Sequence, residues 1–173
     1  MVGPTGAGKT TLAIELLSRG GVLFADDIVA LQGRGDEAVA HPGPALMNVP
    51  RSVKPLDPQA WEVLAEIGDE DWVAVRRVPP PPQAIRAIVL LTSGVAAAEC
   101  VSLAPTSLQV LPYMVTFTHL LDERRRQQFE VAGGLAAGAS LISLSRPPRA
   151  DPAQLADLIL ECLDGDAASR VPG

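Results

Sequence analysis

The sequence predicts an α/β fold, with a mixed sheet flanked by helices. A glycine-rich loop, Gly3–Thr11, leads directly into a helical pattern, and short apolar runs of strand type then alternate with helical patterns. With 173 residues, of which 47% are hydrophobic and only 3% aromatic, the chain is long enough for one domain with an aliphatic core. We expect this domain to span residues 1–164 and a flexible tail to span residues 165–173.

The first helix is predicted at Lys9–Arg19, and its apolar face carries Leu12, Leu16 and Leu17. A loop of this kind normally follows a buried β-strand, but only Met1 and Val2 precede Gly3. We therefore expect the N-terminal strand to be missing from this chain. Either the native start lies upstream, or the chain is a fragment, or the protein has lost that strand, and the first two explanations are favoured.

The next elements are a strand and a hairpin. Val22–Ala25 is a short apolar run that predicts a strand, and the strand ends in the acidic pair Asp26-Asp27. Residues 28–31 and Ala38–Ala40 flank a polar, glycine-containing turn and predict a hairpin, which His41–Pro44 ends.

The middle of the chain predicts a helix, a polyproline connector and three strands. Asp57–Ile67 is predicted as a helix because Asp57 suits the N-cap position, and Trp61, Leu64 and Ala65 share a face. Pro79–Pro82 is expected to be a stiff, exposed connector. The strands are expected at Trp72–Val78, Ile85–Thr92 and Glu99–Leu103.

The last third of the chain predicts helices around one further strand, Ser140–Leu144. Thr106–Leu121 is expected to form one or two helices, and Asp151 is a suitable N-cap for a closing helix at Pro152–Leu163. The helix before the strand is expected at Asp122–Ala137, with Phe129, Ala132 and Leu135 on its apolar side.

Composition excludes several classes of protein. The net charge of -6 and the pI near 4.8 argue against nucleic-acid binding, which needs a basic face. No apolar run is long enough for a membrane span and no signal segment opens the chain, so we expect a cytoplasmic protein without a membrane partner. Cys100 and Cys162 stand apart without a C-x-x-C pattern, which argues against a metal site or a disulfide framework.

The loop fits the phosphate-binding pattern G-x-x-x-x-G-K-[ST] in full, from Gly3 through Gly8 to Thr10. Glycines let successive backbone N–H groups turn into one concavity that suits an anion, and the start of the following helix faces the same phosphates. Lys9 supplies a positive charge for the terminal phosphates of ATP, and the Thr10 hydroxyl suits Mg²⁺. The expected nucleotide-binding residues are Gly3, Pro4, Thr5, Gly6, Ala7, Gly8, Lys9, Thr10 and Thr11.

Asp26 and Asp27 form the second candidate site, at the end of the strand predicted after the first helix. Carboxylates placed there suit Mg²⁺ binding, or can accept the proton of an attacking hydroxyl group. An acidic pair that only initiates a turn is the alternative interpretation. The neighbouring phosphate loop favours the functional interpretation.

The segment GPTGAGKTTLAIELLSRGGVLFADDIVAL resembles the nucleotide site of bacterial HPr serine kinase/phosphorylase and its relatives. Those proteins carry the same loop, a helix that ends in Arg-Gly and a strand that ends in Ala-Asp-Asp, which Arg19-Gly20 and Ala25–Asp27 match. The resemblance is strong over Gly3–Leu31. Beyond it, Ala40–Pro44, Arg76–Leu91 and the ERRRQQFE helix are loosely similar to shorter HPr-kinase-like proteins.

The resemblance implies a P-loop kinase fold related to that of phosphoenolpyruvate carboxykinase, with ATP and Mg²⁺ as cofactors. It implies transfer of the ATP γ-phosphate to a serine, or another hydroxyl, of a protein or peptide. Lys9, Asp26 and Asp27 would then be catalytic, with Asp26 as the base, and Thr10 and Asp27 would lie at the metal. Family members often assemble, which leaves a homo-oligomer open.

Two features depart from the family. The E-[IV]-R-G segment that follows the acidic pair is absent, and His41–Pro44 occupies its neighbourhood. A histidine that the family carries upstream of the loop is absent from this chain too. These departures argue against HPr itself as the substrate and against the reverse phosphorolysis reaction.

Two other classes of function stay open. A small-molecule kinase would need an arginine-rich lid, for which Arg124–Arg126 is the only candidate. A non-catalytic ATP-binding regulatory protein is favoured by the missing strand and the missing family segment. Among single residues, His41 and His119 fit turn and packing roles better than catalysis, whereas Arg76-Arg77 suits either a phosphate clamp or a solvated edge.

Overall fold

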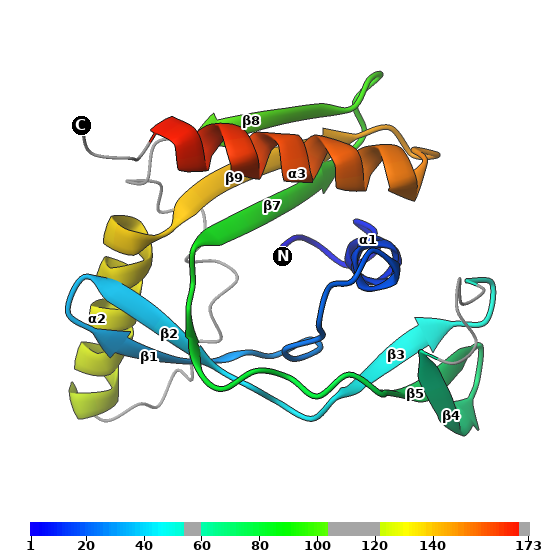
Figure 1. Cartoon of the computed structure of the whole chain (residues 1–173), viewed down its shortest axis with the longest axis horizontal. Helices are drawn as coiled ribbons and strands as arrows, with labels where there is room; N and C mark the ends of the chain where they lie inside the picture. The colour runs from blue at the N-terminus through cyan, green and yellow to red at the C-terminus, as the bar shows by residue number, and fades with distance from the viewer. Residues whose placement is uncertain (54–59, 104–121, 170–173) are drawn as a thin grey trace.

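The computed structural model describes residues 1–53, 60–103 and 122–169. Within these ranges the chain is a small α/β protein with three helices and nine strands in three sheets, one of them mixed (Figure 1). The α/β class with a mixed sheet is therefore confirmed. The helices are α1 (Lys9–Ser18), α2 (Asp122–Gly138) and α3 (Pro152–Ser169). The strands are β1 (Ala30–Arg34), β2 (Glu37–His41), β3 (Leu46–Pro50), β4 (Trp61–Ile67), β5 (Glu70–Val75), β6 (Gln83–Ala84), β7 (Ala87–Ser93), β8 (Glu99–Leu103) and β9 (Ser140–Arg146).

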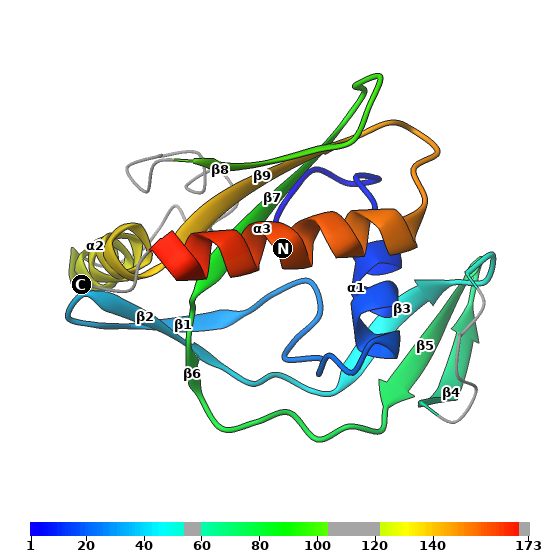
Figure 2. The ribbon, with the colours of Figure 1, turned by 45° about the horizontal axis from the view of Figure 1, so that its top comes forward.

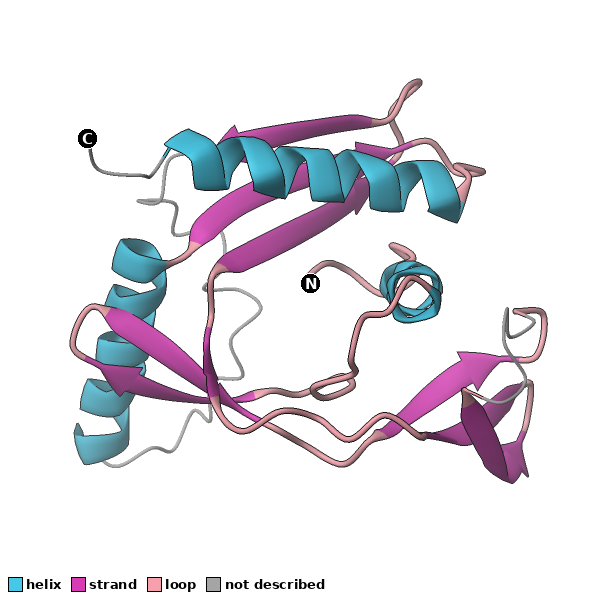
Figure 3. Cartoon of the chain, viewed as in Figure 1, coloured by secondary structure: helices cyan, strands magenta, loops and turns pink. Residues whose placement is uncertain are grey.

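The mixed sheet has the order β7-β9-β8, and its three strands lie where the apolar runs predicted them. β7 is parallel to β9, and β8 is antiparallel to β9. Leu91, Ile142 and Leu144 are completely buried, because α3 covers this sheet (Figure 3). The parallel register ends with Ser93 beside Arg146, so the carboxyl ends of β7 and β9 share one edge.

The remaining edge of β7 is occupied by Val2, which forms a parallel bridge with Leu90. The Val2 N–H donates to the Val89 oxygen, and the Leu91 N–H donates to the Val2 oxygen, each at 2.8 Å. The chain then passes so close to β7 that a Cβ atom on Gly3 would lie 2.5 Å from the Leu91 oxygen. The glycine-rich loop that begins at Gly3 therefore starts at the carboxyl ends of the parallel strands, where a phosphate-binding loop is expected.

Helix α1 lies between two hydrophobic clusters, and Figures 1 and 2 show it end-on and from the side. Leu12 packs with the mixed sheet and α3, whereas Ile14 packs with the sheet β3-β5-β4. The predicted helix is confirmed except for its last residue, Arg19. Because both faces are held, the loop in front of α1 is fixed relative to both sheets.

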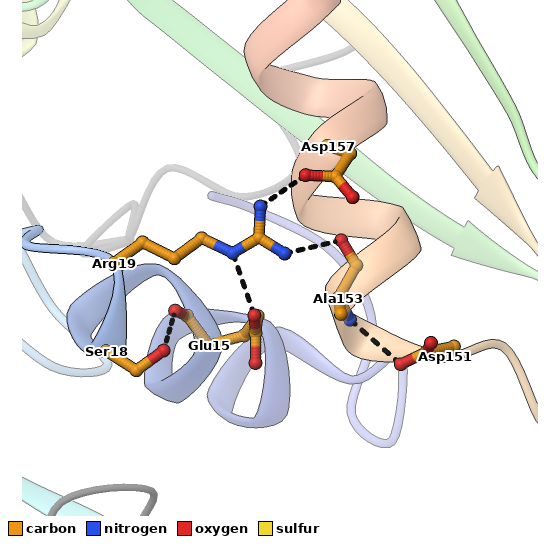
Figure 4. A network of polar contacts seen from close by, with 6 residues as sticks. All are labelled: Glu15, Ser18, Arg19, Asp151, Ala153 and Asp157. Carbon is orange, nitrogen blue, oxygen red and sulfur yellow. Dashed lines mark hydrogen bonds and ion pairs between the residues drawn. The ribbon is translucent and has the colours of Figure 1, made fainter.

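An ion-pair network fixes α1 against the start of α3 (Figure 4). The Arg19 guanidinium donates from Nε to Glu15 Oε1 at 2.8 Å, from Nη2 to the Ala153 oxygen at 2.9 Å, and from Nη1 to Asp157. Its hydrogen bond with Asp157, and then that with Glu15, raise the pKa of Arg19 above its ordinary value. The predicted N-cap of α3 is confirmed, because Asp151 Oδ1 accepts the Ala153 N–H at 3.0 Å.

The strand predicted at Val22–Ala25 is wrong, since these described residues have no ladder partner. Leu23 is buried with the sheet β3-β5-β4, which explains the apolar composition without a strand. The Phe24 oxygen instead accepts the N–H of Gly43 at 2.8 Å. This hydrogen bond attaches the connection between α1 and β1 to the segment that follows β2. The hairpin is confirmed as β1 and β2, with a tighter turn than predicted.

The helix predicted over residues 57–67 is wrong where the structure describes it, because Trp61–Ile67 forms strand β4; residues 57–59 lie outside the described part. Trp61 pairs with Val75 of β5 and is buried in the cluster around Ile14. Leu64, expected on the apolar face of a helix, is 54% exposed at a bulge in β4. Pairing with β5 therefore overrides the helical spacing of these apolar residues.

Helix α2 is confirmed, but part of its buried face differs from the prediction. Phe129 is 80% exposed, whereas Val131 and Leu135 are buried against the hairpin β1–β2, which α2 crosses (Figure 3). Gly134 explains the choice of face, because a glycine lets the helix backbone approach the backbone of β2.

We expect Gly134→Ala to lower the free energy of unfolding by about 1–3 kcal/mol, the usual cost of overpacking. An added Cβ atom would lie 2.5 Å from the Glu37 oxygen, which is backbone and cannot move aside alone. Gly133→Ala is the matched control, since no atom lies within 4 Å of its Cβ position. That variant should gain roughly 0.5–1 kcal/mol from helix propensity. Urea denaturation measures both, and equal stability of the two variants would contradict the close backbone contact.

The fold brings together the side chains of Cys100 on β8 and Cys162 on α3. Both are free thiols and pack against the cluster under the mixed sheet. Burial, together with the hydrogen bond to Cys162, raises the pKa of Cys100 to about 12. The thiol of Cys100 is therefore protonated at neutral pH.

The closing helix α3 is longer than predicted and extends to Ser169, into residues expected to form the tail. The helices predicted at Thr106–Leu121 lie outside the described residues. Of the helices that the structure describes, none has both the length and the apolar character needed to cross a membrane.

Candidate phosphate-binding site

The loop Gly3–Gly8 turns sharply into α1. Gly6 and Gly8 have φ angles of 78° and 97°, a region in which residues with a Cβ atom are strained. Ala7 between them is only 1% exposed, and its N–H donates to the Pro4 oxygen at 3.2 Å. The backbone therefore requires glycine at positions 6 and 8, while Pro4 and Thr5 form an exposed rim.

The N-terminus of α1 offers backbone donors at the end of this loop. Gly8 is the N-cap residue and has no side chain to cap the helix, and the first turn contains no acidic residue. The Leu12 N–H is bonded to the Gly8 oxygen at 3.0 Å, whereas the N–H groups of Lys9, Thr10 and Thr11 have no acceptor within the helix. Together with the helix dipole, these donors suit an anion.

Lys9 lies folded over the loop. Its ammonium group donates to the Gly3 oxygen at 3.0 Å and to the Pro4 oxygen at 3.1 Å. An ammonium group has three N–H donors, so one of them is left for a ligand. The structure thus places Lys9 at the loop, as the motif predicts.

The acidic pair lies in an irregular turn before β1 rather than at the end of a strand. Asp26 is half-buried, and its Oδ2 accepts the Asn48 N–H at 3.0 Å. Asp27 is exposed and has a φ angle of 44°, in the left-handed region that is unusual for a residue other than glycine. Gly43 supports this turn, because a Cβ atom there would lie 3.0 Å from the Cβ atom of Ala25.

The predicted site residues are brought together only in part. Gly3–Thr11 is one continuous segment in which Lys9 contacts the start of the loop, but among the described residues no hydrogen bond or ion pair joins Asp26 or Asp27 to it. In Figure 1 the connection that carries the pair lies below α1, on the opposite side from α3. In the described residues, no three His, Cys, Asp or Glu side chains cluster as a metal site.

The other residues considered from the sequence have local partners or no described contact. His41 Nε2 lies 3.2 Å from Gln32 Oε1, across the hairpin. Arg77 donates to the Gly21 oxygen at 3.2 Å, while Arg76 is exposed. The side chains of Arg124 and Arg125, and all of His119, lie outside the described part of the chain.

Sequence reasoning missed Arg146, the last residue of β9. Its Nε donates to the Ala7 oxygen at 2.6 Å, and its Nη2 donates to the Gly6 oxygen at 3.2 Å. A Cβ atom on Gly8 would lie 3.1 Å from the same guanidinium. An arginine after a buried strand and before two prolines was visible in the sequence, but its contact with the loop depends on the parallel pairing of β9 with β7.

The loop, Lys9, the start of α1 and Arg146 together form a concentrated set of N–H donors and positive charge. Such a set can bind a phosphate group through its oxygens. Comparison with protein-family models, with curated proteins and with solved structures finds no match to this chain.

Proposed function

We propose that this chain binds ATP with Mg²⁺ at the loop Gly3–Thr11 and transfers the γ-phosphate to a hydroxyl group of a protein or peptide. The observation that supports this most is the complete phosphate-loop pattern, with Gly6 and Gly8 at positive φ directly before α1. The likeness of Gly3–Leu31 to HPr-kinase-like proteins suggests a serine as the acceptor.

The residues present fit a nucleotide phosphate with its metal ion. The unpaired N–H groups at the start of α1 and the Lys9 ammonium would hold the β- and γ-phosphates. Mg²⁺ commonly uses one or two protein ligands together with phosphate oxygens, and the Thr10 hydroxyl and an Asp27 oxygen suit those places. When bound, the ion would neutralise charge on the phosphates.

Asp26 is the proposed general base. Its Oδ2 is fixed by the Asn48 N–H, which leaves Oδ1 to accept a proton. The acceptor oxygen would form a bond to the γ-phosphorus while the bond to the oxygen that bridges to the β-phosphate breaks. The hydroxyl proton passes to Asp26, and the products are ADP and a phosphate monoester.

A non-catalytic ATP-binding protein is the second candidate. One observation favours it: in the described residues, no polar contact links the acidic pair to the loop. The two candidates share the phosphate site and differ only in whether transfer follows binding.

Label transfer from ATP separates the two candidates. The protein is incubated with Mg²⁺, γ-labelled ATP and a library of peptides that contain serine, threonine or tyrosine, and phosphopeptide and ADP are measured. Formation of both in equal amounts supports the kinase. ATP binding without turnover supports the non-catalytic candidate, and turnover that needs a small metabolite in place of a peptide contradicts the protein-kinase proposal.

A further inference from the structure

We propose that Arg146 is a positioning residue for phosphate binding, which holds the loop so that the backbone N–H of Gly8 faces the anion. The inference rests on the proposed phosphate site and assigns a role to a residue outside the motif. Its guanidinium contacts the oxygens of two successive loop residues, Gly6 and Ala7, at 3.2 and 2.6 Å.

These two contacts fix the orientation of two peptide planes. In a planar trans peptide the C=O and the next N–H point in opposite directions. The Ala7 oxygen points to Arg146, so the N–H of Gly8 points away from it. That donor is the one next to the unpaired N–H groups of α1, so the guanidinium aligns it with the rest of the anion site.

Further hydrogen bonds fix Arg146 on the side away from the loop. Its Nη1 donates to the oxygens of Pro147 and Pro148, each at 3.2 Å, and proline restricts the backbone that carries them. Its own oxygen accepts the Gly94 N–H at 3.2 Å, and β9 is paired on both sides. Four hydrogen bonds from one guanidinium give it little freedom, as a positioning role requires.

The glycine of the motif makes room for this arginine. A Cβ atom on Gly8 would lie 3.1 Å from both Nε and Nη2 of Arg146, so a side chain there would push the guanidinium back by a few tenths of an ångström. The contact also places a cation beside the N-terminus of α1, where the helix dipole favours an anion. A phosphate bound at the N–H groups on the far side of the loop would offset both positive charges.

Lysine should not replace Arg146, because an ammonium group is a point charge and lacks the planar fork that reaches two oxygens at once. The test compares Arg146→Lys, Arg146→Gln and the control Arg149→Gln, which removes a charge from an exposed residue in the turn after β9. Dissociation constants for Mg·ATP and for inorganic pyrophosphate are measured by calorimetry. We expect both Arg146 variants to bind about tenfold more weakly than the unmodified protein, and Arg149→Gln to stay within about twofold.

Amide NMR spectra of the nucleotide-free variants give a second measurement that does not depend on activity. We expect the N–H signals of Gly6, Ala7 and Gly8 to shift in both Arg146 variants, while the urea midpoint stays unchanged. Binding by Arg146→Lys equal to that of the unmodified protein would mean that charge alone suffices, and would overturn the positioning role.

The same experiments separate this inference from the proposed function. If the unmodified protein binds neither Mg·ATP nor pyrophosphate, the proposed function fails, and the NMR spectra then decide the role of Arg146. Loop signals that stay in place in Arg146→Gln would overturn that role. Signals that shift at the loop alone would support Arg146 as the residue that holds it.

Discussion

Replacement of Lys9 by alanine is expected to weaken Mg·ATP binding by about 100-fold or more. A hydrogen bond to a charged group contributes about 1.5–3 kcal/mol, and the ammonium group can reach two phosphate oxygens once it leaves the Gly3 and Pro4 oxygens. The free energy of unfolding should change by less than about 1 kcal/mol, because the oxygens that lose the ammonium lie at a loop open to water. Calorimetry with Mg·ATP and urea denaturation measure the two quantities.

Arg86→Ala is the control for this experiment. It also removes one positive charge, from an exposed ion pair in which Arg86 lies 3.1 Å from Glu37. Its binding should equal that of the unmodified protein. If Lys9→Ala binds Mg·ATP as well as Arg86→Ala does, the loop is not the nucleotide site.

Asp26→Asn is expected to reduce phosphate transfer by about 100- to 10,000-fold, the usual contribution of a general base, while Mg·ATP binding is retained. The asparagine keeps an oxygen that can accept the Asn48 N–H, so the turn around residue 26 should be preserved. Rates of phosphopeptide formation at saturating ATP measure the effect, and calorimetry measures binding.

Asp27→Asn is the matched variant, because it makes the same chemical change one residue along, at an exposed side chain. Because Asp27 is the proposed metal ligand, loss of its carboxylate should raise the Mg²⁺ concentration that gives the half-maximal rate. Full activity in both variants would exclude the acidic pair from the chemistry, and loss of rate in Asp27→Asn alone would reverse the two roles.

Local sequence patterns correctly predicted two kinds of element. These are elements set by contacts between residues close in sequence, and strands that consist of a clear apolar run. The loop, α1, the strands of the mixed sheet and the cap of α3 by Asp151 belong to these two kinds. The loop could be predicted because positive φ angles at Gly6 and Gly8 exclude most other residues. Glycine at these two positions is therefore enough to predict the turn of the loop.

The wrong predictions concern segments whose structure depends on contacts with residues far away in the sequence. Val22–Ala25 is apolar because Leu23 is buried, although no strand pairs with it. Trp61–Ile67 has helical spacing but pairs with β5, and α2 turns Val131 rather than Phe129 inward because Gly134 meets the backbone of Glu37. The contact between Arg146 and the loop joins residues from opposite ends of the chain, and no local pattern indicates it.

Because α1 lies between two clusters, a ligand bound at the proposed site would affect the cooperativity of unfolding. Leu12 belongs to one cluster and Ile14 to the other, so neither sheet can separate from α1 without opening a core. A ligand present at 100 times its dissociation constant adds about 2.7 kcal/mol to the stability of the state that binds it. Because the proposed binding loop leads directly into this shared helix, a bound ligand should stabilise the contacts of α1 with both sheets, so that the two clusters unfold together.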